Sequence, residues 1–293
     1  MDNIALLGIP LYTLAKYRGM GAAVRTLREL GLPEALRKNA TRFRDLGDVN
    51  LPSLEVDEGP GNTRNFQHFV RCSEAIYDAA SRVSEDDLVF CLGGECGVIV
   101  GSLASFRTKF KGDPSLLWFD AHGDFNTPET TPSGFMGGMP LAFACGRGPN
   151  LTPRIDSQRP LLLERRVVHL GSRELDQAEA QAMQSSPMRM YSASKVKEQG
   201  MARVADDVAN FLSNAADWIV CHLDIDVVDP SVMAAVNYPS KGGLTPEDIK
   251  TILERVRRTG KMKVFNLAAY NPLLDKEHKS AEIVLDIAKA VLS

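Results

Sequence analysis

Short apolar segments rich in Leu, Val, Ile and Phe alternate along the chain with longer segments in which apolar residues recur at helical spacing. The apolar segments are the expected strands, at 4–9, 42–47, 87–92, 115–120, 167–171, 188–191, 217–224 and 262–268. The expected helices span 21–30, 66–83, 97–110, 203–213, 246–257 and 280–292. We therefore expect an α/β fold, a three-layer α/β/α sandwich around a mainly parallel sheet of about eight strands.

One domain is expected over residues 1–293, because no repeat, low-complexity tract or Pro/Gly linker divides the chain. The 34 basic and 37 acidic residues include no basic run, so nucleic acid is not an expected partner. The first residues do not resemble a leader, and no run of about 18 apolar residues occurs. We expect no membrane contact and a cytoplasmic location. The five scattered cysteines indicate reduced thiols.

Three of the expected strands end in polar residues that a hydrophobic core would not select. These segments are LVFCLGGECG at 88–97, LLWFDAHGDFN at 116–126 and WIVCHLDIDVVDP at 218–230. Parallel α/β sheets bind ligands just beyond the carboxyl ends of their strands. The functional site is therefore expected where these three segments end.

Asp120, His122 and Asp124 occupy alternate positions after an expected strand, so their side chains point the same way. Asp224 and Asp226 repeat this spacing at the end of another strand. Four clustered carboxylates repel one another unless cations lie among them, and oxygen ligands with one imidazole suit Mn²⁺ or Mg²⁺. Helix caps and turns are the alternative explanation of aspartates after strands. The occurrence of two such segments favours a metal site.

Several motifs resemble those of the ureohydrolases, the family of arginase, agmatinase and formiminoglutamase. The motifs occur in the family's order, as GGECG at 93–97, DAHGDFNTP at 120–128, SGFMGGMP at 133–140, GSRELD at 171–176, LDIDVVDP at 223–230 with GGLT at 242–245, and YNP at 270–272. The resemblance implies an arginase-like fold and a metal-dependent enzyme that hydrolyses a C–N bond of a guanidino or amidino compound.

The resemblance also implies two divalent ions, usually Mn²⁺, that share carboxylates and bridge an attacking hydroxide. Asp120 and Asp224 would bridge both ions, and Asp124 would bind one of them. These three aspartates are the predicted catalytic residues. His122 and Asp226 would bind the other ion.

Cys96 stands where the family pattern has a histidine ligand. The hydroxyarginine hydrolases, which this chain resembles in this respect, also have a cysteine at this position. A thiolate is softer than an imidazole and adds a negative charge to the site. We therefore expect weaker Mn²⁺ binding at Cys96, with Zn²⁺, Co²⁺ or Fe²⁺ as possible replacements. A buried thiol that contacts no metal is the alternative.

Two further departures from the family pattern concern the chemistry. Gly137 aligns with a histidine that transfers a proton to the leaving amine, and Ala269 aligns with a glutamate that pairs with the substrate guanidinium. A less basic amidine needs no carboxylate partner, and a more acidic leaving group needs less proton assistance. N-hydroxyguanidines have both properties. Glu95 and Tyr238 could replace a lost group or serve only in packing.

Asn126, Ser133 and Asp176 align with residues that bind the α-amino and α-carboxylate groups of arginase substrates, so an amino-acid-like substrate is expected. The leading hypothesis is hydrolysis of N-hydroxyarginine or arginine, with release of hydroxyurea or urea. A non-catalytic relative that binds a metal or an amino acid is one alternative, and a metallohydrolase of an amide or formimino substrate is another. The resemblance also implies a homo-oligomer, either a trimer or a hexamer.

Overall fold

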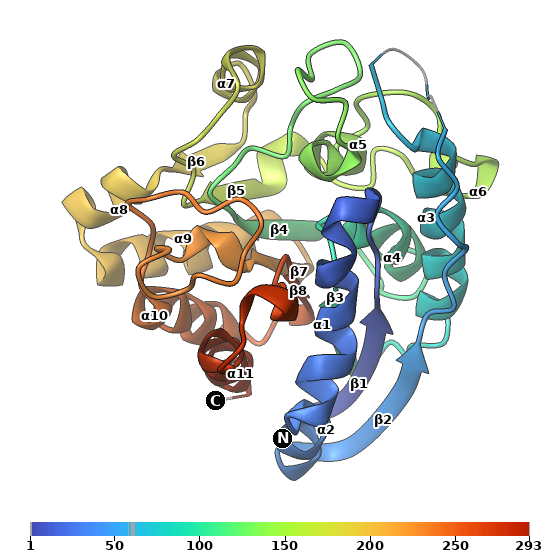
Figure 1. The fold of residues 1–293 in the computed structure, drawn as a ribbon. Helices are drawn as coiled ribbons and strands as arrows, with labels where there is room; N and C mark the ends of the chain where they lie inside the picture. The colour runs from blue at the N-terminus through green and yellow to red at the C-terminus, as the bar shows by residue number, and fades with distance from the viewer. Residues whose placement is uncertain (1, 58, 60–61, 293) are drawn as a thin grey trace.

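The computed structural model describes residues 2–57, 59 and 62–292, and it contains one eight-stranded sheet (Figure 1). The strand order is β2-β1-β3-β8-β7-β4-β5-β6, and every neighbouring pair is parallel. The strands are β1 (Asp2–Ile9), β2 (Ala40–Asp48), β3 (Asp87–Gly93), β4 (Pro114–Phe119), β5 (Val167–Leu170), β6 (Arg189–Tyr191), β7 (Trp218–Asp224) and β8 (Met262–Ala268). The predicted α/β sandwich is confirmed, and its sheet is parallel throughout.

Helices cover both faces of the sheet, which explains why the central strands are apolar on both sides. Apolar residues of α1, α2 and α8 to α11 pack on one face, and those of α3 to α5 pack on the other. The helices are α1 (Arg18–Glu29), α2 (Leu32–Lys38), α3 (Phe66–Ala80), α4 (Val98–Phe106), α5 (Pro140–Ala144), α6 (Pro153–Asp156), α7 (Gln177–Gln184), α8 (Ala193–Gln199), α9 (Met201–Ala215), α10 (Pro246–Arg257) and α11 (Lys279–Ala290).

Each of the eight expected strands and six expected helices has a counterpart in the structure, with ends that differ by a few residues. The sequence reading missed the shorter helices α2, α5, α6, α7 and α8. The longest of them, α7, buries only Glu179 and Met183, so it has no apolar stripe that could reveal it.

The strand order decides which loops can share a site. Strands β3, β8, β7 and β4 are consecutive neighbours, so the segments that follow their carboxyl ends lie side by side. These segments carry Cys96, Ala269, Asp226 and Asp120, respectively. No helix of the described residues is both long and apolar enough to span a membrane.

Candidate metal centre and pocket

Asp120 and Asp226 face each other across His122 at the ends of β4 and β7. The Nδ1 atom of His122 lies 3.1 Å from Asp226 Oδ2 and 3.4 Å from Asp120 Oδ1. Backbone amides fix the carboxylates: the amide of His122 donates to Asp120 Oδ1 at 2.7 Å, and that of Ala121 donates to Asp226 Oδ1 at 3.2 Å. The two strand ends therefore bring three predicted ligands into one cluster.

Cys96 and Asp224 extend this cluster. The thiol of Cys96 donates to Asp224 Oδ2 at 2.9 Å, and the amide of Asp226 donates to Asp224 Oδ1 at 2.8 Å. Ligand atoms of Cys96, Asp120 and Asp224 lie within 4.8 Å of one another. Cys96 thus lies among the carboxylates and not in a separate apolar site.

Asp124 lies in the loop after β4 with a φ of +50°, a left-handed conformation that is uncommon for a residue with a side chain. Its Oδ2 atom is buried and has no hydrogen-bond partner among the described residues. An unpaired buried carboxylate oxygen is costly unless a cation or a proton satisfies it. Asp124 is therefore placed to receive one.

The electrostatics of the cluster call for added positive charge. Burial and the neighbouring carboxylate of Asp226 raise the pKa of Asp120 to about 6. Burial and nearby aspartates also raise the pKa values of Asp124 and Asp224 well above the usual range. Burial opposes ionisation of Asp226 as well, but the hydrogen bond and charge of His122 hold the pKa of that carboxyl below its usual value.

This donor set fits divalent ions. Two groups, Cys96 with Asp120 and Asp224, and His122 with Asp120 and Asp226, each place three ligand atoms within the range of a single ion. Asp120 belongs to both groups, as expected of a bridging carboxylate, whereas Asp224 belongs only to the group of Cys96 and Asp124 belongs to neither. Carboxylate oxygens suit Mn²⁺ or Mg²⁺, whereas the thiol shifts its own group towards softer ions.

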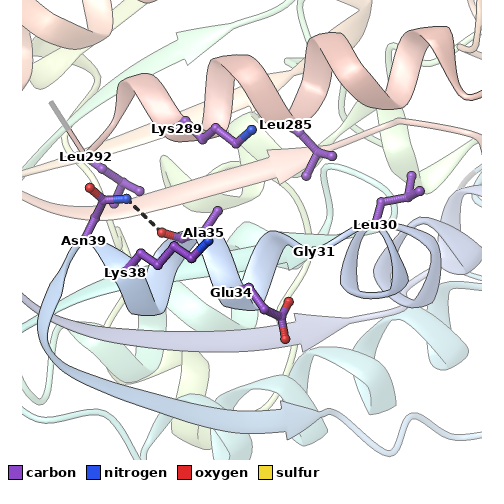
Figure 2. Close-up of a pocket in the computed structure, with 9 residues that line it drawn as sticks. All are labelled: Leu30, Gly31, Glu34, Ala35, Lys38, Asn39, Leu285, Lys289 and Leu292. Atoms are coloured by element: carbon purple, nitrogen blue, oxygen red, sulfur yellow. Dashed lines mark hydrogen bonds between the residues drawn. The ribbon is translucent and has the colours of Figure 1, made fainter.

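All the predicted ligands except Asp120 line a cavity of about 490 Å³. A second cavity, of about 540 Å³, lies between α2 and α11 (Figure 2). Its lining includes Leu30, Leu285, Lys38 and Lys289 and contains none of the predicted site residues. Only the first of these two cavities therefore combines space for a substrate with the predicted ligands.

The three predicted substrate-binding residues all line the first cavity. The side-chain amide of Asn126 donates to Asp176 Oδ2 at 2.9 Å, so this pair is already formed. Ser133 is exposed and its hydroxyl accepts from the amide of Phe135 at 3.2 Å. Asp176 caps α7 and is also exposed. These side chains offer both donors and an anionic acceptor to a ligand.

Another part of the cavity lining is apolar and aromatic. Ala269 packs in a cluster with Tyr17, Met20 and Phe135. A side chain at Gly137 would collide with the ring of Phe135, so this ring fills the space beside the glycine. Glu95 also lines the cavity, and burial raises the pKa of its carboxyl group to about 7.

Sequence reasoning missed several residues that shape the site. Arg173 donates to the carbonyl oxygen of Asp226 at 2.9 Å and to that of Ser240 at 2.8 Å, which ties two loops together. Glu179 accepts from the amide of Phe125 at 2.8 Å and forms a capping box with Asp176. The capping box was visible as an acidic residue three positions after Asp176, but the loop contacts of Arg173 had no sequence signal.

His222 projects on the same side of β7 as Asp224, but it lies in the core below the site. Its ring stacks on the indole of Trp118 with centroids 3.9 Å apart and planes at 9°. The indole nitrogen of Trp118 donates to Asp120 Oδ2 at 3.0 Å. Neither ring nitrogen of His222 has a hydrogen-bond partner within the described part of the chain. His222 is therefore a packing neighbour of the site.

Buried carboxylates that can share ions beneath a substrate-sized cavity are typical of metal-dependent hydrolases. Comparison with known proteins then gives the family. The sequence model described as "Arginase family" matches residues 2–293, and this chain belongs to that family. Its members are metal-dependent C–N hydrolases of guanidino and amidino compounds.

Individual relatives agree with this assignment along the whole chain. The arginase of Bacillus caldovelox is 29% identical over 288 residues, covering 97% of this chain and 96% of the relative. The arginase of Bacillus subtilis (strain 168) is 28% identical over 296 residues, covering 100% of this chain and 98% of the relative. The crystal structure of the Bacillus caldovelox enzyme superposes with a TM-score of 0.92 at 28% identity and covers 100% of this chain and 99% of the other.

Proposed function

We propose that this chain hydrolyses a C–N bond of an amino-acid N-hydroxyguanidine, with N-hydroxyarginine as the first candidate. Water supplies the oxygen of the new C–O bond and the proton for the departing side-chain amine, so the products are hydroxyurea and a diamino acid. One observation supports this choice over arginine. The cavity above the carboxylate cluster carries no side chain at Ala269 that could pair with a guanidinium cation.

Six residues would hold the ions: Cys96, Asp120, His122, Asp124, Asp224 and Asp226. Bound divalent ions would polarise the substrate and lower the pKa of water enough to supply hydroxide near neutral pH. In this proposal Asp120, Asp124 and Asp224 would be the catalytic carboxylates that hold the ions. Mn²⁺ is the first candidate, and the thiol of Cys96 makes Zn²⁺, Co²⁺ and Fe²⁺ the next.

Asn126, Ser133 and Asp176 are the proposed binding residues for the amino-acid end of the substrate. The carboxylate of Asp176 suits an α-ammonium group, and the donors of Asn126 and Ser133 suit an α-carboxylate. These three residues and Ala269 line the same cavity. The substrate would therefore reach from the exposed side chains to the carboxylate cluster.

The basicity of the substrate explains the choice of an N-hydroxyguanidine. An alkylguanidinium is cationic at neutral pH, and desolvating it without a counter-charge is costly. An N-hydroxyguanidine is less basic, so its neutral form can enter the cavity at a smaller cost. A formimino or amide substrate shares this advantage and is the second candidate.

The test is metal analysis by mass spectrometry, followed by assays of protein loaded with Mn²⁺, Co²⁺ or Zn²⁺. N-hydroxyarginine, arginine, agmatine and formiminoglutamate are compared by release of hydroxyurea, urea or ammonia. Two ions per chain and the highest kcat/KM on N-hydroxyarginine are expected. Faster turnover of arginine would refute the proposed substrate, and turnover of formiminoglutamate alone would select the second candidate.

A homo-oligomeric state, either trimer or hexamer, and a cytoplasmic location stay predictions from the sequence. Light scattering coupled to size-exclusion chromatography tests the first, and subcellular fractionation tests the second.

A further inference from the structure

Two neighbouring residues of the loop between β7 and α10, Asn237 and Tyr238, line the cavity near the carboxylate cluster. The ring of Tyr238 lies edge to face with that of His122, with centroids 5.9 Å apart. The Tyr238 side of the cavity is continuous with the apolar cluster around Ala269, because Phe135 contacts both. The chemistry of Asn237 and Tyr238 therefore decides what the reacting end of a substrate meets.

The orientation of the Asn237 amide is fixed by a short chain of hydrogen bonds. The backbone amide of Leu273 donates to Asn271 Oδ1 at 3.0 Å, so Asn271 must present its Nδ2 group to Asn237. Asn271 Nδ2 then donates to Asn237 Oδ1 at 3.0 Å. The remaining group, Asn237 Nδ2, is buried and has no partner within residues 2–57, 59 and 62–292. Asn237 thus keeps an unused hydrogen-bond donor.

Tyr238 supplies a second donor. Its hydroxyl group is hydrogen-bonded to the hydroxyl group of Tyr17. Tyr17 is buried, with 8% of its surface exposed, whereas Tyr238 is 40% exposed. When Tyr17 donates to Tyr238, the hydrogen of Tyr238 is free for a ligand. The rings of Tyr17 and Phe135 pack against Tyr238, with centroids 5.4 Å and 6.0 Å away, and hold it in place.

The carboxylate of Glu95, which also lines the cavity, is already occupied. Its Oε1 atom accepts from the backbone amide of Thr13 at 2.8 Å, and its Oε2 atom accepts from the Thr13 hydroxyl at 2.7 Å. Turning Glu95 towards a substrate would leave both groups of Thr13 without a partner. Asn237 and Tyr238 therefore present donors and aromatic surface beside the cluster, and an exposed carboxylate of the lining, that of Glu174, lies 4.0 Å from His122 Nε2.

These donors do not match a guanidinium group, which has five N–H donors and no acceptor. They do match an oxygen atom attached to the amidine. We propose that Asn237 and Tyr238 form a specificity wall that selects the N-hydroxyl oxygen of the substrate and discriminates against unmodified arginine. This inference rests on the proposed function, because it specifies the group that the same cavity recognises.

Two substitutions test the wall with minimal change of shape. Asn237→Asp replaces the unused NH₂ group by an anionic oxygen and keeps the oxygen that accepts from Asn271. Tyr238→Phe removes one hydroxyl group and keeps the ring. Tyr77→Phe is the matched control, because Tyr77 lies on α3 and does not line the cavity. For each Mn²⁺-loaded protein, the Kd values of N-hydroxyarginine and arginine are measured by calorimetry, and initial rates are measured in parallel.

Wild-type protein and Tyr77→Phe should bind N-hydroxyarginine more tightly than arginine. Tyr238→Phe should weaken N-hydroxyarginine binding about tenfold and change arginine binding less than about twofold, as expected for one lost hydrogen bond. Asn237→Asp should shift the preference towards arginine by about tenfold or more, because it converts a donor into a counter-charge.

The outcomes separate this inference from the proposed function. An unchanged Kd ratio in both variants overturns the wall, even if N-hydroxyarginine is hydrolysed. Tighter wild-type binding of arginine also overturns it, because the rings would then be acting as a cation–π surface. Preferential binding without turnover supports the wall and refutes the proposed function. Absence of binding by either compound refutes both.

Discussion

Replacing Cys96 by histidine should raise the affinity of the site for Mn²⁺ by about a hundredfold at pH 7. Burial and the nearby carboxylates of Asp224, Asp124 and Asp120 raise the pKa of the Cys96 thiol well above its ordinary value of 9.0. A thiol must lose its proton to bind a metal. The ordinary thiol value of 9.0 already lies two units above pH 7, which corresponds to a deprotonation cost of about 3 kcal/mol, or about a hundredfold in affinity, and burial adds to this cost.

The thiol of Cys96 already has a hydrogen-bond partner. The thiol donates to Asp224 Oδ2 at 2.9 Å, so metal binding must break this hydrogen bond as well. An imidazole binds metals in its neutral form and carries no such cost near pH 7. The softer Zn²⁺ ion should gain less from Cys96→His than Mn²⁺ does, because the thiolate compensates it with a stronger bond.

Calorimetric titration with Mn²⁺, repeated in two buffers with different ionisation enthalpies, measures both affinity and proton release. Wild-type protein should release about one more proton than Cys96→His on filling this site, and its affinity should rise about tenfold for each pH unit between pH 6.5 and 8.5. Cys96→Ser is the size-matched control. Equal proton release and equal affinity in wild type and Cys96→His would refute Cys96 as a ligand.

Three further predictions concern the same region. Asp120→Asn and Asp224→Asn should each abolish hydroxyurea release, because each removes a carboxylate that is proposed to hold the ions; turnover above a few per cent of wild type would contradict this. Trp118→Phe should weaken Mn²⁺ binding about tenfold in a metal titration, since Asp120 Oδ2 loses a donor at 3.0 Å. Burial raises the pKa of Glu95 to about 7, so between pH 4.5 and 7 the folded state keeps a proton on Glu95 that the unfolded state has lost. The free energy of unfolding should therefore decrease as the pH rises from 4.5 to 7. Urea unfolding of Glu95→Gln should show a shallower decrease over this range.

The sheet could be predicted because its strands are short, apolar and separated by amphipathic helices. Strand β4 is buried at all six positions and ends at Asp120, where the change from apolar to acidic residues is abrupt. The alternate positions of Asp120, His122 and Asp124 also predicted that their side chains point to the same side. This information is local in the sequence, so it needs no knowledge of the tertiary fold.

The aromatic and amide side of the cavity could not be predicted in this way. Tyr17 and Tyr238 are 221 positions apart, and both lie outside the strands. The free donor of Asn237 depends on two successive hydrogen bonds, from Leu273 to Asn271 and from Asn271 to Asn237. Neither relation produces a periodic pattern, and only the tertiary structure brings these residues together.

Gly137 and Ala269, the two departures from the family pattern, both lie beside the ring of Phe135. The ring of Phe135 occupies the space that a side chain at Gly137 would need, and it also packs in the cluster that contains Ala269. A histidine at 137 would have to displace Phe135, and a glutamate at 269 would bury its charge against Tyr17 and Met20, at a cost of several kcal/mol for an unpaired ion. Neither reversion alone would restore a guanidinium site, because the whole side of the cavity is built from apolar surface and hydrogen-bond donors. The proposed change of substrate would account for both substitutions together, since Phe135 packs against Tyr17 and Tyr238 in the same part of the cavity.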